Sequence, residues 1–116
     1  HNGIIENFEA LRAELQAKEY VFESETDTET IAHLIQEELK QQNDLFSAVR
    51  IAAGRLQGAF AIAVVQEDFP ERIVVAREGS PLLLGLGEEG NYAASDASAL
   101  LQATRRMVYL ENGDIA

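Results

Sequence analysis

The spacing of apolar residues changes near the middle of the chain. In the first half, apolar side chains recur every three or four positions, which is the period of an amphipathic helix. This spacing predicts three helices, at residues 4–18, after Thr26, and at 44–56. The short run Tyr20–Ser24 is rich in β-forming residues and predicts a strand between the first two helices.

From Gly58 onward the pattern is typical of short strands separated by turns. Residues 58–66 are an apolar run in which small alanines alternate with bulky side chains, which predicts a strand without a solvent-exposed face. Asn112-Gly113 is a hairpin signal whose return strand would be residues 114–116. Helices followed by antiparallel strands predict an α+β fold with helices layered on sheet. The other predicted elements are strands at 72–77, 82–86, 91–95 and 107–110, and a capped helical turn at 96–101.

Composition narrows the class of protein. The 116 residues suffice for one domain, and 47% apolar with 25% charged residues is a globular composition. The net charge is −11 and the only adjacent basic pair is Arg105-Arg106, so we expect no nucleic-acid partner. No apolar run approaches membrane-spanning length, so we expect no membrane partner. The chain has no cysteine, which excludes disulfides and thiolate metal sites within it and fits a cytoplasmic protein.

The first candidate for chemistry is the pair Asn2-Gly3. Asn-Gly is used where the backbone needs a positive φ, and it is also a very common turn signal. One interpretation is therefore a tight turn that begins a helix. The other is an oxyanion hole, in which the Asn2 side-chain amide and the Gly3 backbone N–H point at one atom.

The second candidate is Asp27, within Ser24-Glu25-Thr26-Asp27-Thr28-Glu29. Ser, Thr and Asp residues crowd the start of the second predicted helix, so an ordinary helix N-cap explains Asp27. Thr26 and Glu29 also have the spacing of a capping box. A carboxylate at this position would equally suit the binding of an ammonium group.

Several motifs together resemble one family. HNGIIEN (residues 1–7), SETDTE (24–29), SPLLLGLG (80–87), ASD with ALL (94–101) and LENGDIA (110–116) resemble the glutaminase domains of the glutamine–fructose-6-phosphate aminotransferase family, or glucosamine-6-phosphate synthases. The resemblance covers essentially the whole chain. HNG followed by DTE is shared by several class II glutamine amidotransferases, whereas IIEN and SETDTE indicate the amino-sugar branch.

The resemblance implies a fold, a reaction and roles for three residues. The fold would be the αββα four-layer sandwich of N-terminal-nucleophile hydrolases, in which an N-terminal cysteine attacks the side-chain amide of glutamine. Asn2 and Gly3 would form the oxyanion hole, and Asp27 would bind the α-amino group of the substrate. The released ammonia would pass to a sugar-isomerase domain that makes glucosamine 6-phosphate. No cofactor and no metal are implied.

The chain departs from the family pattern at its ends. The nucleophilic cysteine, the arginine for the substrate carboxylate and the sugar-isomerase domains are absent from residues 1–116. We therefore expect one partial glutaminase domain over residues 1–116, a fragment that lacks the N-terminal part with the nucleophile and is inactive by itself. Its partners would be glutamine and the missing parts of the parent chain. Unpaired strand edges and apolar faces lead us to expect a homo-oligomer.

Two alternatives remain open at the level of the sequence. One is another class II amidotransferase, such as the phosphoribosyl-pyrophosphate or asparagine branch. The other is a non-catalytic module that senses glutamine after loss of the nucleophile. The two histidines do not change this choice, because His33 is read as a partly exposed helix residue and His1 has no evident acid–base role.

Overall fold

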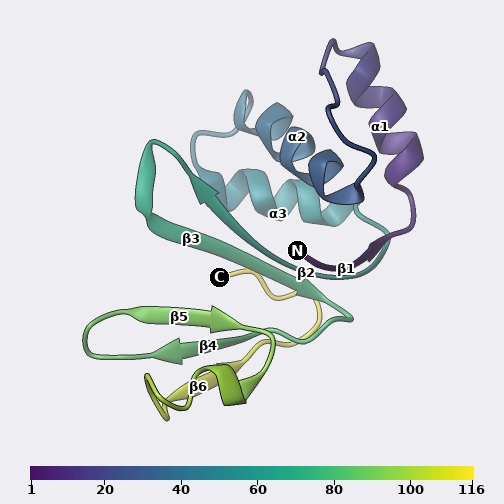
Figure 1. Cartoon of the computed structure of the whole chain (residues 1–116). Coiled ribbons are helices and arrows are strands. Elements are labelled where there is room, and N and C mark those ends of the chain that lie inside the picture. Colours follow the sequence, from purple (N-terminus) through teal and green to yellow (C-terminus); the bar gives the residue numbers. More distant parts are fainter.

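The computed structural model describes all 116 residues and divides them into a helical layer and two antiparallel sheets (Figure 1). The α+β class predicted from the sequence is confirmed. None of the helices is both long and apolar enough to span a bilayer. The elements are β1 (Asn2–Ile5), α1 (Phe8–Ala17), α2 (Asp27–Leu39), α3 (Leu45–Arg55), β2 (Gly58–Gln66), β3 (Phe69–Glu78), β4 (Leu83–Leu86), β5 (Asn91–Ala94), a 3₁₀ turn (Ala97–Ala99) and β6 (Met107–Tyr109).

The helices begin where side chains cap them. Thr26 precedes α2 and its Oγ1 accepts the backbone N–H of Glu29 at 3.4 Å. Asp44 does the same for α3, accepting the N–H of Ser47 at 2.7 Å. Asp96 caps the 3₁₀ turn through the N–H of Ser98, as the sequence predicted. Such caps satisfy backbone donors that a helix leaves without partners at its first turn.

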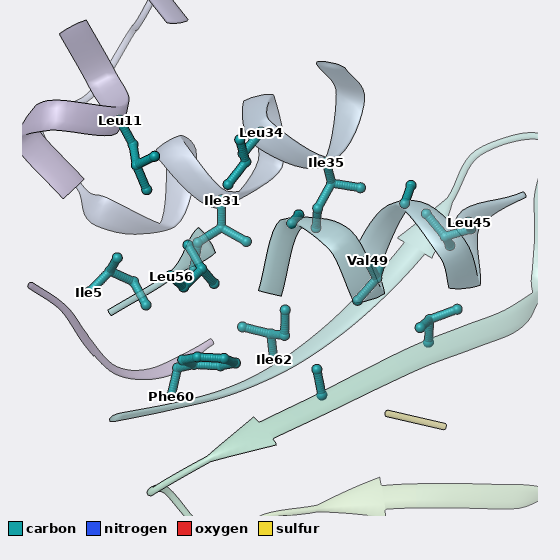
Figure 2. Close-up of a cluster of buried hydrophobic side chains, with 14 of the residues drawn as sticks. Ile5, Leu11, Ile31, Leu34, Ile35, Leu45, Val49, Leu56, Phe60 and Ile62 are labelled. Atoms are coloured by element: carbon teal, nitrogen blue, oxygen red, sulfur yellow. The ribbon is translucent and has the colours of Figure 1, made fainter. Parts of the chain in front are cut away.

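The helices cover one face of the first sheet, whose strand order is β1-β2-β3 (Figure 1). Phe60 and Ile62 alternate along β2 and point at the helices, because successive side chains of a strand face opposite sides. Figure 2 shows them beneath Ile31 and Val49 of the helical layer. Fifteen buried side chains make up this main core, and it lies between the helices and the first sheet.

The second sheet has the strand order β5-β4-β6 and packs against the other face of the first sheet through a much smaller cluster. That cluster consists of Ala61, Val75, Leu82 and Leu110. Asn112-Gly113 does form a turn, but the predicted hairpin is wrong. The residues after it return to β3 of the first sheet, where Ala116 exchanges two backbone hydrogen bonds with Val75 at 2.8 and 3.0 Å. The turn therefore connects the two sheets.

Three other sequence predictions differ from the structure. Residues 4–7 are not helical, because Ile4 and Ile5 belong to β1 and the helix begins at Phe8. Residues 20–24 form no strand, because no neighbouring strand pairs with them. Strand β2 is not buried on both faces, since the side chains of Ala59, Ala63 and Val65 are exposed where the second sheet does not reach.

Candidate functional site

Asn2 and Gly3 lie on β1, at the edge of the first sheet and not in a helix-starting turn. They pair with Ala61 and Phe60 of β2. Gly3 has φ +103°, and a Cβ here would lie 2.1 Å from the carbonyl oxygen of Ala59. Only glycine fits such a conformation this close to the neighbouring backbone. The Asn-Gly signal thus marks a required glycine, but in a strand.

The backbone N–H groups of Ile5 and Glu6 point to opposite sides of the chain. The N–H of Glu6 donates toward β2, to the carbonyl of Gln57 at 2.7 Å. The N–H of Ile5 points away from β2, to the side chain of Asp27 at 2.9 Å. Gly3 lies two residues before Ile5, but its φ of +103° takes it out of the regular alternation of the strand.

Asp27 is the first residue of α2, and its carboxylate is turned toward β1. It is not the N-cap, since Thr26 holds that position. Oδ2 accepts the N–H of Ile5, while Oδ1 lies 3.9 Å from Nδ1 of His1 and accepts no hydrogen bond within the chain. The Asp27 side chain keeps 22% of its surface exposed, so its second oxygen can be reached from outside.

His1 provides a second connection between β1 and α2. Its Nδ1 lies 2.8 Å from the hydroxyl of Thr28, and its side chain is only 6% exposed. His1 and Ile5 stand on either side of Asn2 and Gly3; His1 contacts Thr28, and Ile5 donates to Asp27. The structure therefore brings the oxyanion-hole candidates and Asp27 together, although 22 or more positions separate them in the sequence.

The Glu29 carboxylate accepts hydrogen bonds from the segment that precedes α2. Its Oε1 accepts the backbone N–H and the hydroxyl of Ser24 at 2.7 and 2.6 Å. Its Oε2 accepts the N–H of Glu23 at 2.8 Å and contacts Nε2 of His33 at 3.0 Å. The hydroxyl of Ser24, followed by the other hydrogen bonds, lowers the pKa of the Glu29 carboxyl to about 2. The predicted capping box is half right, because Glu29 binds residues further upstream than the N-cap.

His33 is a partly exposed helix residue, as predicted from the sequence. Its ring lies 5.2 Å from the ring of Tyr20 and 4.6 Å from that of Phe22. The alternating aromatics that suggested a strand at residues 20–24 instead pack against α2 and the main core. Their period of two is therefore real, but it serves packing and not sheet pairing.

Asn7 is a structural residue that sequence reasoning passed over within HNGIIEN. Its amide donates to the carbonyl of Arg55 at 2.9 Å and accepts the N–H of Gln57 at 2.9 Å. These two hydrogen bonds hold the start of α1 against the junction of α3 and β2. The sequence offered no signal for it, because Asn7 and its partners are about 50 positions apart.

The candidate site lies where the edge strand β1 meets the first turn of α2. The principal cavities are lined by other residues, for example a cavity of about 490 Å³ beside the C-terminal half of α2 and the end of β2. No group of three or more histidine, cysteine or acidic side chains could hold a metal ion. These residues offer the exposed side-chain amide of Asn2 on β1 and one carboxylate oxygen of Asp27 on α2 that has no hydrogen-bond partner.

The fold is similar to that of glutamine amidotransferases of N-terminal-nucleophile type. The solved structure of glutamine phosphoribosylpyrophosphate amidotransferase from B. subtilis, complexed with ADP and GMP, superposes with a TM-score of 0.80 at 26% identity. It covers 98% of this chain and 25% of that one. A structure of the allosteric regulatory enzyme of purine biosynthesis gives a TM-score of 0.79, also at 26% identity, covering 98% of this chain and 24% of that one.

The chain belongs to the glutamine amidotransferase domain family, whose model matches residues 1–102. Along its whole length it is 59% identical to glutamine–fructose-6-phosphate aminotransferase (isomerizing) of Acidithiobacillus ferridurans. It is 57% identical to the protein of the same name from Idiomarina loihiensis. In both comparisons the chain spans 19% of the relative's length. The family resemblance drawn from the sequence motifs is confirmed.

Proposed function

We propose that this chain is part of the glutamine-hydrolysing domain of an aminotransferase that makes glucosamine 6-phosphate from fructose 6-phosphate and glutamine. The identities of 59% and 57% over the whole chain favour this branch of the family over the others. The observation that carries the proposal is the Asp27 carboxylate, which is held against β1 with one oxygen left for a ligand. We infer a cytoplasmic location, which suits a small domain that uses no disulfides.

Asn2 and Gly3 would stabilise the oxyanion that forms when the side-chain amide of glutamine is attacked. Asn2 and Gly3 are neighbours on β1, the edge strand of the first sheet, and both are exposed. Two fixed donors cost no reorganisation as the charge develops, and loss of one such donor typically lowers the rate about 10²–10³-fold.

Asp27 would bind the α-ammonium group of glutamine. Its Oδ2 is occupied by Ile5, which fixes the plane of the carboxylate, and Oδ1 remains to accept a charge-assisted hydrogen bond. The nucleophile must come from outside these residues, because the chain contains no cysteine. By the family resemblance it would be an N-terminal cysteine, and residues 1–116 alone would be inactive.

The test uses the full-length protein and two substrates, L-glutamine and glutaramate, which lacks only the α-amino group. Asp27→Asn should lower kcat/KM for L-glutamine about 10- to 100-fold, since hydrogen bonds to charged groups contribute about 1.5–3 kcal/mol. It should leave kcat/KM for glutaramate nearly unchanged. Asp44→Asn is the matched control, because Asp44 caps α3 and contacts no residue of the site. An equal fall for both substrates would contradict the role of Asp27.

We further propose that the chain self-associates through the uncovered face of the first sheet. Val65 and Ile73 are 67% and 53% exposed there, and the neighbouring cavity is lined mostly, though not entirely, by apolar residues. Exposed apolar surface of this kind favours association. Sedimentation at micromolar concentration should detect a dimer or larger species, and a clean monomer would count against self-association.

A further inference from the structure

We propose that Glu29 is a positioning residue for the ammonium-binding subsite, acting through Ser24 and Thr26 on Asp27. The proposal rests on the function assigned above to Asp27. The Glu29 carboxylate is already saturated by two backbone N–H groups, one hydroxyl and one histidine nitrogen. It has no strong hydrogen-bonding capacity left for a substrate, so any effect on binding must be indirect.

A continuous path of polar contacts leads from Glu29 to the residue before Asp27. The Ser24 hydroxyl donates to Oε1 of Glu29 at 2.6 Å and lies 2.9 Å from the hydroxyl of Thr26. Thr26 in turn caps α2 and is bonded to the backbone N–H of Glu29 at 3.4 Å. The segment 23–26 is thus fixed at the point where the chain enters the helix, and Asp27 is the next residue.

The position of Asp27 needs such support because one carboxylate serves two partners. Oδ2 must stay on the N–H of Ile5 while Oδ1 is presented to the ligand. A change in the path of residues 23–26 would move the first turn of α2 relative to β1. Misplacement of a binding group by about 1 Å can cost up to about 10²-fold in rate.

The surroundings of Glu29 keep it rigid. His33 lies one helical turn further along α2 and contacts Oε2, while its ring is packed against Tyr20 and Phe22. Arg12 of α1 donates to the carbonyl of Ser24 at 2.9 Å, which holds the same segment from its other side. Side chains from two helices therefore fix a segment that has no strand partner.

The experiment compares kcat/KM for L-glutamine and glutaramate in the full-length protein carrying Glu29→Gln. An amide nitrogen cannot accept the hydrogen bonds that one carboxylate oxygen accepts now, so segment 23–26 should loosen. We expect the preference for L-glutamine to fall about tenfold through a raised KM for glutamine, with kcat changed less than about twofold.

Glu37→Gln is the matched control for this variant. Glu37 lies on the same helix and accepts a hydrogen bond from the hydroxyl of Tyr20 at 2.8 Å, at the other end of the same loop. It is remote from the N-terminus of α2, so its loss should lower stability without changing the substrate preference.

Two outcomes separate the inference from the proposed function. If Glu29→Gln lowers kcat/KM equally for both substrates, as a general folding defect would, Glu29 has no positioning role. If the unaltered protein hydrolyses glutamine and glutaramate equally well, Asp27 does not bind the ammonium group and the proposed function of the site fails first. A selective loss in Glu29→Gln, with none in Glu37→Gln, supports the inference.

Discussion

Two regions of the molecule differ greatly in the size of the buried apolar cluster that stabilises them. The first region is the helical layer with the first sheet, and the other is the second sheet where it packs on the first. Between the helices and the first sheet lie 15 buried residues, whereas only four form the cluster between the two sheets. The first region also contains the contacts that join β1, α1, α2 and α3 across long sequence distances. All three candidate site residues, Asn2, Gly3 and Asp27, belong to it.

The candidate site therefore lies in the region that has the larger apolar core, between the helices and the first sheet. Catalytic geometry needs supporting residues that are themselves fixed, and β1 and α2 are fixed by packing as well as by hydrogen bonds. The second sheet makes no side-chain hydrogen bond or ion pair with Asn2, Gly3 or Asp27, and leaves part of the first sheet exposed. We expect it to influence association more than the geometry of the site.

The largest effect should come from the main core. Leu34 on α2 is completely buried, so Leu34→Ala should lower the free energy of unfolding by about 3–5 kcal/mol. Leu82→Ala, in the cluster between the sheets, should cost about 2–3 kcal/mol because a small cluster can collapse around the gap. Urea unfolding followed by circular dichroism measures both. Leu101→Ala, at a residue 56% exposed, is the control and should change stability by less than about 0.5 kcal/mol. A larger loss at Leu82 than at Leu34 would reverse the comparison.

A smaller effect is expected where glycines permit close approach. Gly3→Ala should destabilise by about 2–3 kcal/mol, because φ is +103° and the new Cβ would meet backbone atoms of Ala59. Gly85→Ala in β4 should cost less, because its Cβ would meet the side chains of Thr104 and Leu100, which can shift.

Gly54 in α3 is the control of opposite sign for these glycine substitutions. It has open space around it, so Gly54→Ala should stabilise by about 0.4–1 kcal/mol. Thermal unfolding of Gly3→Ala, Gly85→Ala and Gly54→Ala measures their relative stabilities. Equal destabilisation at Gly3 and Gly85 would show that the strand edge is more pliable than the geometry indicates.

The smallest expected effect is a pH dependence of the unfolding free energy, which arises from Glu29 in the first region. The pKa of Glu29 is about 2 in the folded chain and about 4.3 when unfolded. A lowered pKa means that the contacts of Glu29 stabilise the fold above about pH 4.3, and that this contribution is lost as the pH falls toward about 2. The difference in unfolding free energy between the unaltered chain and Glu29→Gln should therefore shrink on acidification.

Unfolding in urea at several values between about pH 6 and pH 3 tests this dependence. Glu88→Gln, at an exposed residue in the turn before β5, should show no such trend. A difference for Glu29→Gln that stays constant down to about pH 3 would contradict the assignment.

The elements that pattern could predict are those whose stability is local. The apolar stripe of α2, its Thr26 cap and the capped turn that begins at Asp96 can all be read from neighbouring residues, and the structure contains each of them. Tyr20–Ser24 has the alternation of a strand, but a strand also requires a partner, and that partner is not a property of the segment itself. Here the N–H groups of Glu23 and Ser24 go to Glu29 instead.

The α+β class, the three helices, the order of the later strands and, through shared motifs, the family could all be predicted from the amino-acid pattern. The pattern also singled out Asn2, Gly3 and Asp27, whose assigned roles stay predictions. The folded chain was needed to show that Asn2-Gly3 is an edge strand, that Asp27 accepts the N–H of Ile5 and does not cap its helix, and that residues 114–116 cross to β3. The reason is physical: local patterns encode which side chains are buried, whereas the partners of backbone groups are chosen among segments far apart in the chain.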